Sequence, residues 1–198
     1  MLSLKYRIQR SLVWTRRFFH LGGNGVHSPF AYTFICEVIE NTTPYYAYSD
    51  LRADLKPLSL RQRKHAKLLF RLANWSQAQT TWLPATMQQY APLIARGCTR
   101  STIHIYADAS ELAPIAAAPG TSQLIIADLT TLPHELAQAT LPEKSVIALF
   151  GIRRNTQARQ RWQTILGEQS GAISFDLYDL GLIVSRPTLN KQHYTVNY

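Results

Sequence analysis

Residues 123–150, QLIIADLTTLPHELAQATLPEKSVIALF, give the clearest indication of the fold class. They contain two short apolar runs, Gln123–Asp128 and Ser145–Phe150, separated by a helix-length segment, His134–Thr140. A strand, a helix and a second strand in this order are typical of a right-handed crossover, which leaves the two strands parallel in one sheet. The stretch therefore predicts an α/β protein.

The same alternation extends in both directions from this stretch. The other predicted strands are Thr81–Pro84, Thr102–Ala107, Ala172–Tyr178 and Leu182–Ser185, and the other predicted helices are Met87–Arg96, Ser110–Ala117 and Thr156–Gly167. The connection between the last two predicted strands is short, because only Asp179 and Leu180 stand before Gly181. We therefore expect these strands to form an antiparallel hairpin at a sheet edge. The predicted fold class is α/β, with a mainly parallel sheet and a C-terminal antiparallel hairpin.

The first third of the chain has a helical pattern. Apolar spacing and capping residues predict three helices, Leu2–His20, Pro29–Glu40 and about Ser59–Trp75, with a loop at Asn41–Tyr48. We therefore divide the chain into a helical N-terminal region, residues 1–78, and an α/β domain, residues 79–198, and expect them to form one compact unit.

The composition excludes several classes of protein. Of 198 residues, 46% are hydrophobic and 17% are charged, which argues against intrinsic disorder. No apolar run approaches the ~20 residues of a transmembrane helix. Cys36 and Cys98 stand far apart, which predicts neither a disulfide framework nor a metal cluster. The N-terminus has no secretory signal pattern, so a cytoplasmic location is expected.

Most of the net charge of +9 belongs to the helical region. Through Arg71 there are 12 basic and 4 acidic residues, whereas the rest of the chain has 9 and 8. One group of these basic residues could bind single-stranded nucleic acid or an anionic surface, together with the tyrosines of the 41–48 loop. The group consists of Arg61, Arg63, Lys64, Lys67 and Arg71. A solvated helix face beside packed tyrosines explains the same residues, and we favour it because no nucleic-acid motif is present.

Candidate site residues stand where the predicted strands end, because ligands of open α/β sheets bind outside the carboxyl ends of the strands. The first strand ends TWLPAT, residues 81–86, which contains no glycine, and Pro84 removes a backbone N–H donor. Asp108 and Asp128 follow the next two strands and could accept hydrogen bonds from ribose hydroxyls or a substrate. The alternative, which we favour, is that Asp108 caps a helix and Asp128 begins a turn. The six histidines lack zinc-site spacing, so no metal is expected.

Several segments together resemble one family. They are GVHSPF at 25–30, KLLFRL at 67–72, SVI at 145–147, Trp162, DLY at 176–178 with GLIV at 181–184, and KQHY at 191–194. As a set, they resemble bacterial class I S-adenosylmethionine-dependent methyltransferases of the O-methyltransferase type. The resemblance covers most of the chain and implies a Rossmann-like sheet, with S-adenosylmethionine as the cofactor if one is bound.

The departures from this family fall on the site. Residues 81–86 replace an acidic residue and a glycine-rich turn, and Ala107, followed by Asp108, replaces the acidic residue that would meet the ribose. Phe150 and Gly151 stand where the family has an acidic pair, and Arg153 and Arg154 then replace polar and aromatic positions. Residues 113–122 are also too few for the usual helix and third strand.

These departures predict a methyltransferase-like protein that no longer methylates and that serves in binding or scaffolding. One alternative is an active methyltransferase with an atypical pocket that uses Asp108 or Asp128. Another is a binder of nucleic acid or an anionic surface through the basic N-terminal region. Pro84, Asp108 and Asp128 are the candidate cofactor contacts, and no catalytic residue is assigned.

Overall fold

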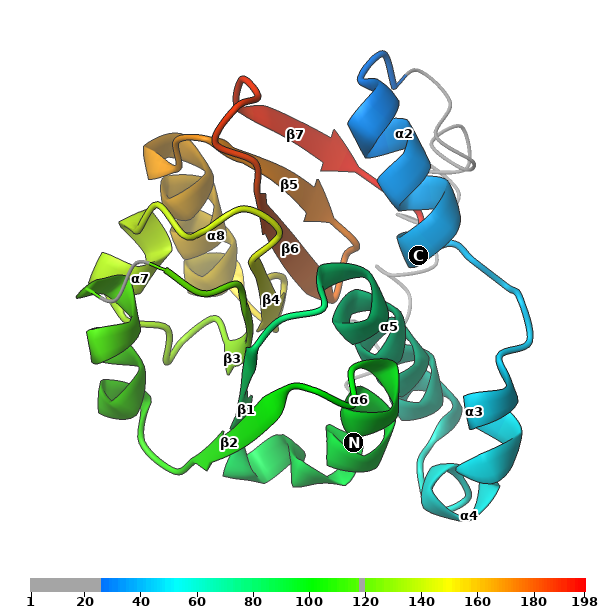
Figure 1. Ribbon diagram of the computed structural model, residues 1–198. Coiled ribbons are helices and arrows are strands. Elements are labelled where there is room, and N and C mark those ends of the chain that lie inside the picture. Colours follow the sequence, from blue (N-terminus) through cyan, green and yellow to red (C-terminus); the bar gives the residue numbers. More distant parts are fainter. Residues whose placement is uncertain (1–25, 118–119) are drawn as a thin grey trace.

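A computed structural model of the protein describes residues 26–117 and 120–198, with one seven-stranded sheet between two layers of helices (Figure 1). The strand order is β2-β1-β3-β4-β6-β5-β7. All neighbouring strands are parallel except β6, which is antiparallel to β4 and to β5. The strands are β1 (Thr80–Pro84), β2 (Thr102–Tyr106), β3 (Gln123–Asp128), β4 (Val146–Phe150), β5 (Ala172–Asp176), β6 (Leu180–Ser185) and β7 (Gln192–Thr195). The predicted Rossmann-like α/β class with its antiparallel hairpin is confirmed.

The hairpin does not lie at the sheet edge, and that part of the prediction is wrong. β6 is inserted between β4 and β5, and β7 pairs in parallel with β5 on the outer side. β7 has only four residues and is partly exposed. A strand this short has no apolar run that would reveal it in the sequence.

One layer of helices joins the N-terminal region to the sheet. It contains α2 (Pro29–Phe34), the π-helix η2 (Ile35–Ile39), α5 (Leu60–Ser76) and α6 (Ala91–Gly97). α2 and η2 together confirm the predicted helix at 29–40. α5 begins with a capping box, in which Ser59 and Gln62 bond each other's backbone N–H groups. A Cβ at Gly97 would lie 2.4 Å from the carbonyl oxygen of Phe70, so only glycine allows α6 this close to α5.

The other layer covers the opposite face of the sheet. It consists of η4 (Ala109–Ala117), α7 (His134–Gln138) and α8 (Thr156–Glu168). Successive side chains of β3 lie on opposite faces of the sheet. Leu124 and Ile126 pack in the core beneath α5, whereas Ile125 and Ala127 pack in the core beneath α8. The central strands are therefore buried on both faces.

Some local elements differ from the prediction. The expected loop at 41–48 leads into two short helices, α3 (Tyr46–Asp50) and α4 (Arg52–Leu55), and a 3-10 helix, η3 (Ala85–Tyr90), precedes α6. The helix expected at 110–117 is wound as the 3-10 helix η4, with Pro114 inside it. The described part of 113–122 contains no strand, in line with the expected shortening. The helix predicted at Leu2–His20 lies outside the described residues.

The helical region and the sheet share side-chain contacts. The rings of Phe34 in α2 and Phe175 in β5 stack with centroids 5.0 Å apart.

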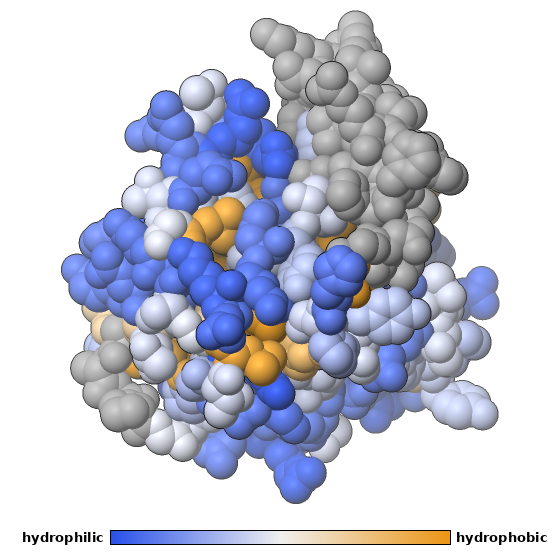
Figure 2. Space-filling view, turned by 90° about the horizontal axis from the view of Figure 1, so that it is seen from above, coloured by the Kyte–Doolittle hydropathy of each residue, from blue (hydrophilic) through white to orange (hydrophobic). Residues whose placement is uncertain are grey.

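Within the helical region, Arg71 of α5 donates to the carbonyl oxygens of Val38 and Ile39 at 2.6 and 2.9 Å. The surface seen from above is mostly hydrophilic, and the hydrophobic residues visible there gather near its centre (Figure 2).

Two further findings concern the thiols and the helices. Neither Cys36 nor Cys98 takes part in a disulfide. Within residues 26–117 and 120–198, no helix has the length and apolar character that crossing a membrane requires.

Candidate functional site

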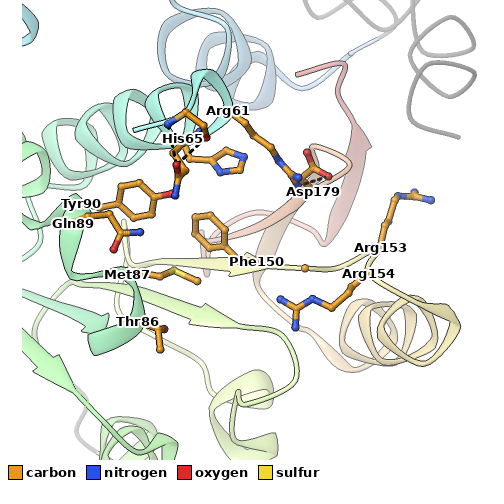
Figure 3. Close-up of a pocket in the computed structure, with 13 residues that line it drawn as sticks. Arg61, His65, Thr86, Met87, Gln89, Tyr90, Phe150, Arg153, Arg154 and Asp179 are labelled. Atoms are coloured by element: carbon orange, nitrogen blue, oxygen red, sulfur yellow. Dashed lines mark hydrogen bonds and ion pairs between the residues drawn. The ribbon is translucent and has the colours of Figure 1, made fainter. Parts of the chain in front are cut away.

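A cavity of about 840 Å³ opens at the carboxyl ends of β1 and β4 (Figure 3). β1 lies between β2 and β3, so the chain reverses its direction of travel across the sheet at this point. Such a reversal at the carboxyl ends is where open α/β sheets bind ligands. Side chains of α5, η3, the end of β4 and the β5–β6 turn surround the cavity.

The backbone that follows β1 cannot cradle a phosphate or nucleoside closely. Pro84 is extended, with φ −67° and ψ 142°, and η3 begins at the next residue. Residues 80–90 include no glycine, and Pro84 offers no N–H. Thr86, Met87 and Gln89 line this side of the cavity.

Three arginines line the cavity, and each is held by an aspartate. Arg61 of α5 pairs with Asp179 at 2.8 Å, an ion pair marked in Figure 3. The other two pairs are Arg153 with Asp176 and Arg154 with Asp128. Asp176 and Asp179 are buried, whereas Arg154 is about half exposed. A guanidinium has five N–H donors, so one carboxylate orients Arg153 or Arg154 without using all of its donors.

An aromatic wall faces these arginines. His65 of α5 meets Phe150 edge-on, with ring centroids 5.2 Å apart, and Tyr90 lies nearly parallel to Phe150 at 6.3 Å. Burial raises the pKa of Tyr90, so its hydroxyl remains protonated at neutral pH. The cavity thus combines an apolar aromatic surface with cationic hydrogen-bond donors.

The three predicted site residues do not line this cavity. Pro84 ends β1 just before the lining segment. Asp108 lies after β2, and its carboxylate accepts the backbone N–H of Ser110 at 2.7 Å. Asp128 accepts the N–H and hydroxyl of Thr130 and reaches the cavity only through Arg154. Both aspartates therefore make the local turn contacts of the favoured alternative.

The predicted basic residues do not share one surface. Arg61 lines the cavity, and Arg63 donates to the carbonyl oxygens of Leu58 and Lys56. Lys64 and Lys67 lie over tyrosine rings on another side of α5. Arg71 is buried, so the expectation of an outward position is wrong for it. The carbonyl oxygens of Val38 and Ile39, at the end of η2, draw its guanidinium inward.

Sequence reasoning did not identify the arginines and Asp179 as a group. In the sequence, Arg153 and Arg154 stand out only as departures from a family pattern, and Asp179 only as a turn residue. Two arginines shortly after a buried strand could have indicated an anion-binding edge. In the part of the chain that the structure describes, no cluster of His, Cys, Asp and Glu is placed to hold a metal ion.

No protein-family model and no curated protein matches this sequence. Among solved structures, the chain is similar to the O-methyltransferase TomG from Streptomyces achromogenes, in complex with SAM, with 16% identity and a TM-score of 0.45. That match covers 73% of this chain and 91% of TomG. It is also similar to cofactor-bound Rv0187 from MTB, with 16% identity, a TM-score of 0.44, and coverage of 79% of this chain and 95% of the other. Both likenesses concern the path of the chain alone.

Proposed function

We propose that this protein has a methyltransferase-like fold, does not transfer methyl groups, and acts by binding a small anionic ligand, on its own or as a scaffolding subunit. The observation that carries the proposal is the lining of the cavity at the carboxyl ends of β1 and β4. Three arginines lie where a ligand of this type of sheet would bind, and the preceding turn has no glycine. The sequence resemblance described above supports the link to methyltransferases.

The cavity does not fit S-adenosylmethionine. This cofactor carries a sulfonium and an ammonium group against one carboxylate, so it is a net cation. The lining offers these two cationic groups no unpaired carboxylate, because Asp179 is already paired with Arg61 at 2.8 Å. The other two guanidinium groups are held by Asp176 and Asp128, which do not line the cavity. Pro84 and the absence of glycine also remove the close backbone contacts that a nucleoside needs.

The same lining suits an anion with an apolar part. Arginine donates in pairs to carboxylate or phosphate oxygens, and the wall of His65, Tyr90 and Phe150 can pack against a ring or a hydrocarbon chain. Arg154 is the most exposed of the three arginines and is therefore the one most accessible to a ligand.

Calorimetric titration of the purified protein with S-adenosylmethionine, and with S-adenosylhomocysteine, tests the loss of methyl transfer. We expect no binding at millimolar ligand. A dissociation constant in the micromolar range, about 8 kcal/mol of binding free energy, would overturn the proposal. If Asp128→Asn also abolished that binding, the result would favour an active enzyme with an atypical pocket.

Thermal-shift measurements with citrate and pyrophosphate, at constant ionic strength, test the anionic ligand. We expect stabilisation of the native protein that Arg154→Gln reduces, because the variant loses one guanidinium at the cavity. Arg100→Gln is the matched control, since it makes the same charge change at an exposed position outside the cavity lining. Equal shifts for both variants would show that the anions act through general charge and not through this site.

A further inference from the structure

A second cavity, of about 650 Å³, lies on another side of α5. The loop after η2, the start of α3, the outer side of α5 and the last two residues form its walls. It shares no lining residue with the cavity of the proposed function. Its size is in the range of cavities that hold drug-sized ligands, roughly 300–1,000 Å³.

Asn197 supplies a buried hydrogen-bond donor in this wall. The residue is 7% exposed, and its side-chain nitrogen Nδ2 is buried with no hydrogen-bond partner among residues 26–117 and 120–198. Leaving a buried amide donor unbonded costs about 1–3 kcal/mol. The neighbouring Val196 is held by its N–H, which donates to the carbonyl oxygen of Asp176 at 2.9 Å, so the backbone beside Asn197 is anchored. Because Nδ2 itself has almost no accessible surface, the Asn197 side chain must rotate for this donor to reach an acceptor within the cavity, and such a bond would remove the cost.

Cationic and aromatic groups surround the same cavity. The Lys64 ammonium lies 4.0 Å from the centre of the Tyr198 ring, and the Lys67 ammonium lies 4.9 Å from that of Tyr48. Arg71 is a buried residue of the cavity wall, and its guanidinium already donates to the backbone carbonyl oxygens of Val38 and Ile39. Burial raises the pKa of Tyr198 to about 12, so that ring carries no negative charge at neutral pH.

The charge balance of these walls favours an anion. Lys64, Lys67 and Arg71 contribute three positive side-chain charges, and Glu40 contributes one negative charge. Tyr45 adds a further aromatic face, which packs edge-on against Tyr48 with centroids 5.5 Å apart. Ammonium groups above tyrosine rings, next to a buried amide donor, complement a negatively charged group attached to a flat ring.

We propose that this second cavity binds a small molecule that carries a phosphate or carboxylate group on a flat ring. The anionic group accepts from Lys67 and from Nδ2 of Asn197, and the ring packs among the tyrosines. This inference is independent of the function proposed for the first cavity. A single-stranded nucleic acid would use the same kinds of group, but a volume of about 650 Å³ matches one small ligand and therefore favours a small molecule.

The test is calorimetric titration of the full chain with four probes: uridine monophosphate, 1-naphthoate, uridine and inorganic phosphate. We expect one ring-bearing anion, the phosphate or the carboxylate, to bind at least about tenfold more tightly than uridine or free phosphate. No binding of either ring-bearing anion at millimolar concentration would overturn the proposal. A uridine hexanucleotide that binds about a hundredfold more tightly than the monophosphate would overturn it in favour of nucleic acid.

Two variants locate the binding. Asn197→Leu removes the unbonded donor, so we expect binding to weaken by about tenfold while the melting temperature stays the same or rises. A purely structural asparagine would instead lower the melting temperature. Lys67→Gln should also weaken binding, whereas Lys56→Gln, an exposed position outside both cavities, should not. Binding that Asn197→Leu and Lys67→Gln leave unchanged, or that Arg154→Gln removes, would place the ligand elsewhere and overturn the proposal.

Discussion

Asp128 shows how one carboxylate can hold a guanidinium at the edge of a cavity. Burial alone would raise the pKa of Asp128, but hydrogen bonds from Thr130 and Arg154 outweigh this effect and leave the pKa below its ordinary value. Because the pKa is lower in the folded than in the unfolded protein, these contacts stabilise the fold above the unfolded pKa of about 4. That stabilisation is lost as the pH falls through the folded value.

The Asp128→Asn variant should therefore be less stable than the parent protein at neutral pH. We expect a loss of about 0.5–1 kcal/mol, because Arg154 is half exposed and solvent screens the pair. The difference should shrink towards zero as the pH falls below about 4. Urea unfolding across this pH range measures it. The exposed Asp54→Asn serves as control, and a deficit for Asp128→Asn that does not change with pH would contradict this explanation.

At the scale of elements, the contact between α8 and β6 depends on the absence of a side chain. Trp162 of α8 is almost completely buried, and its ring lies directly over Gly181 of β6. A Cβ at Gly181 would come within 2.7 Å of the ring atom Cη2. Since an indole ring in a packed core cannot move away freely, helix or strand must shift to accept even a methyl group.

Gly181→Ala should lower the free energy of unfolding by about 1–3 kcal/mol, the usual range for overpacking. Gly167→Ala is the matched control, because Gly167 lies in α8 and a Cβ there would meet no atom within 4 Å. That variant should gain up to about 0.5–1 kcal/mol from the lower chain entropy of alanine. Chemical denaturation of both proteins decides the matter, and equal stability of Gly181→Ala and the parent would refute the close contact.

At the scale of the whole molecule, we propose that residues 1–78 and 79–198 unfold as one unit. A single core cluster joins residues of both parts, from Ala31 and Leu72 in the helical region to Leu124 and Val196 in the α/β part. Neither part can lose its partner without exposing this apolar surface.

Unfolding followed by circular dichroism and by tryptophan fluorescence should give coincident transitions. Hydrogen exchange followed by mass spectrometry should show the amides of α5 and β4 opening with the same free energy, because both elements belong to the shared core. Earlier exchange throughout α5, with β4 still protected, would show that the helical region is a separate unit.

Local sequence patterns were enough to predict the fold class and most elements. Apolar runs and helix caps depend on neighbouring residues, so they revealed β3, β4, α5 and α8 to within a few residues. β7 was not predicted, because its four partly exposed residues form no clear apolar pattern. The absence of glycine after β1 was also visible in the sequence, and it already argued against a cofactor cradle.

Which side chains share a site became visible only in the folded molecule. Arg61 and Asp179 come from the first helix layer and the last hairpin, and no local pattern relates them until the chain folds back to place them 2.8 Å apart. Charge counting likewise placed Arg71 on a solvated face, whereas the carbonyl oxygens at the end of η2 hold it inside. Periodicity reports which face of an element is apolar, but an ion pair or a buried donor depends on partners distant in the chain. The packing of the whole molecule selects those partners.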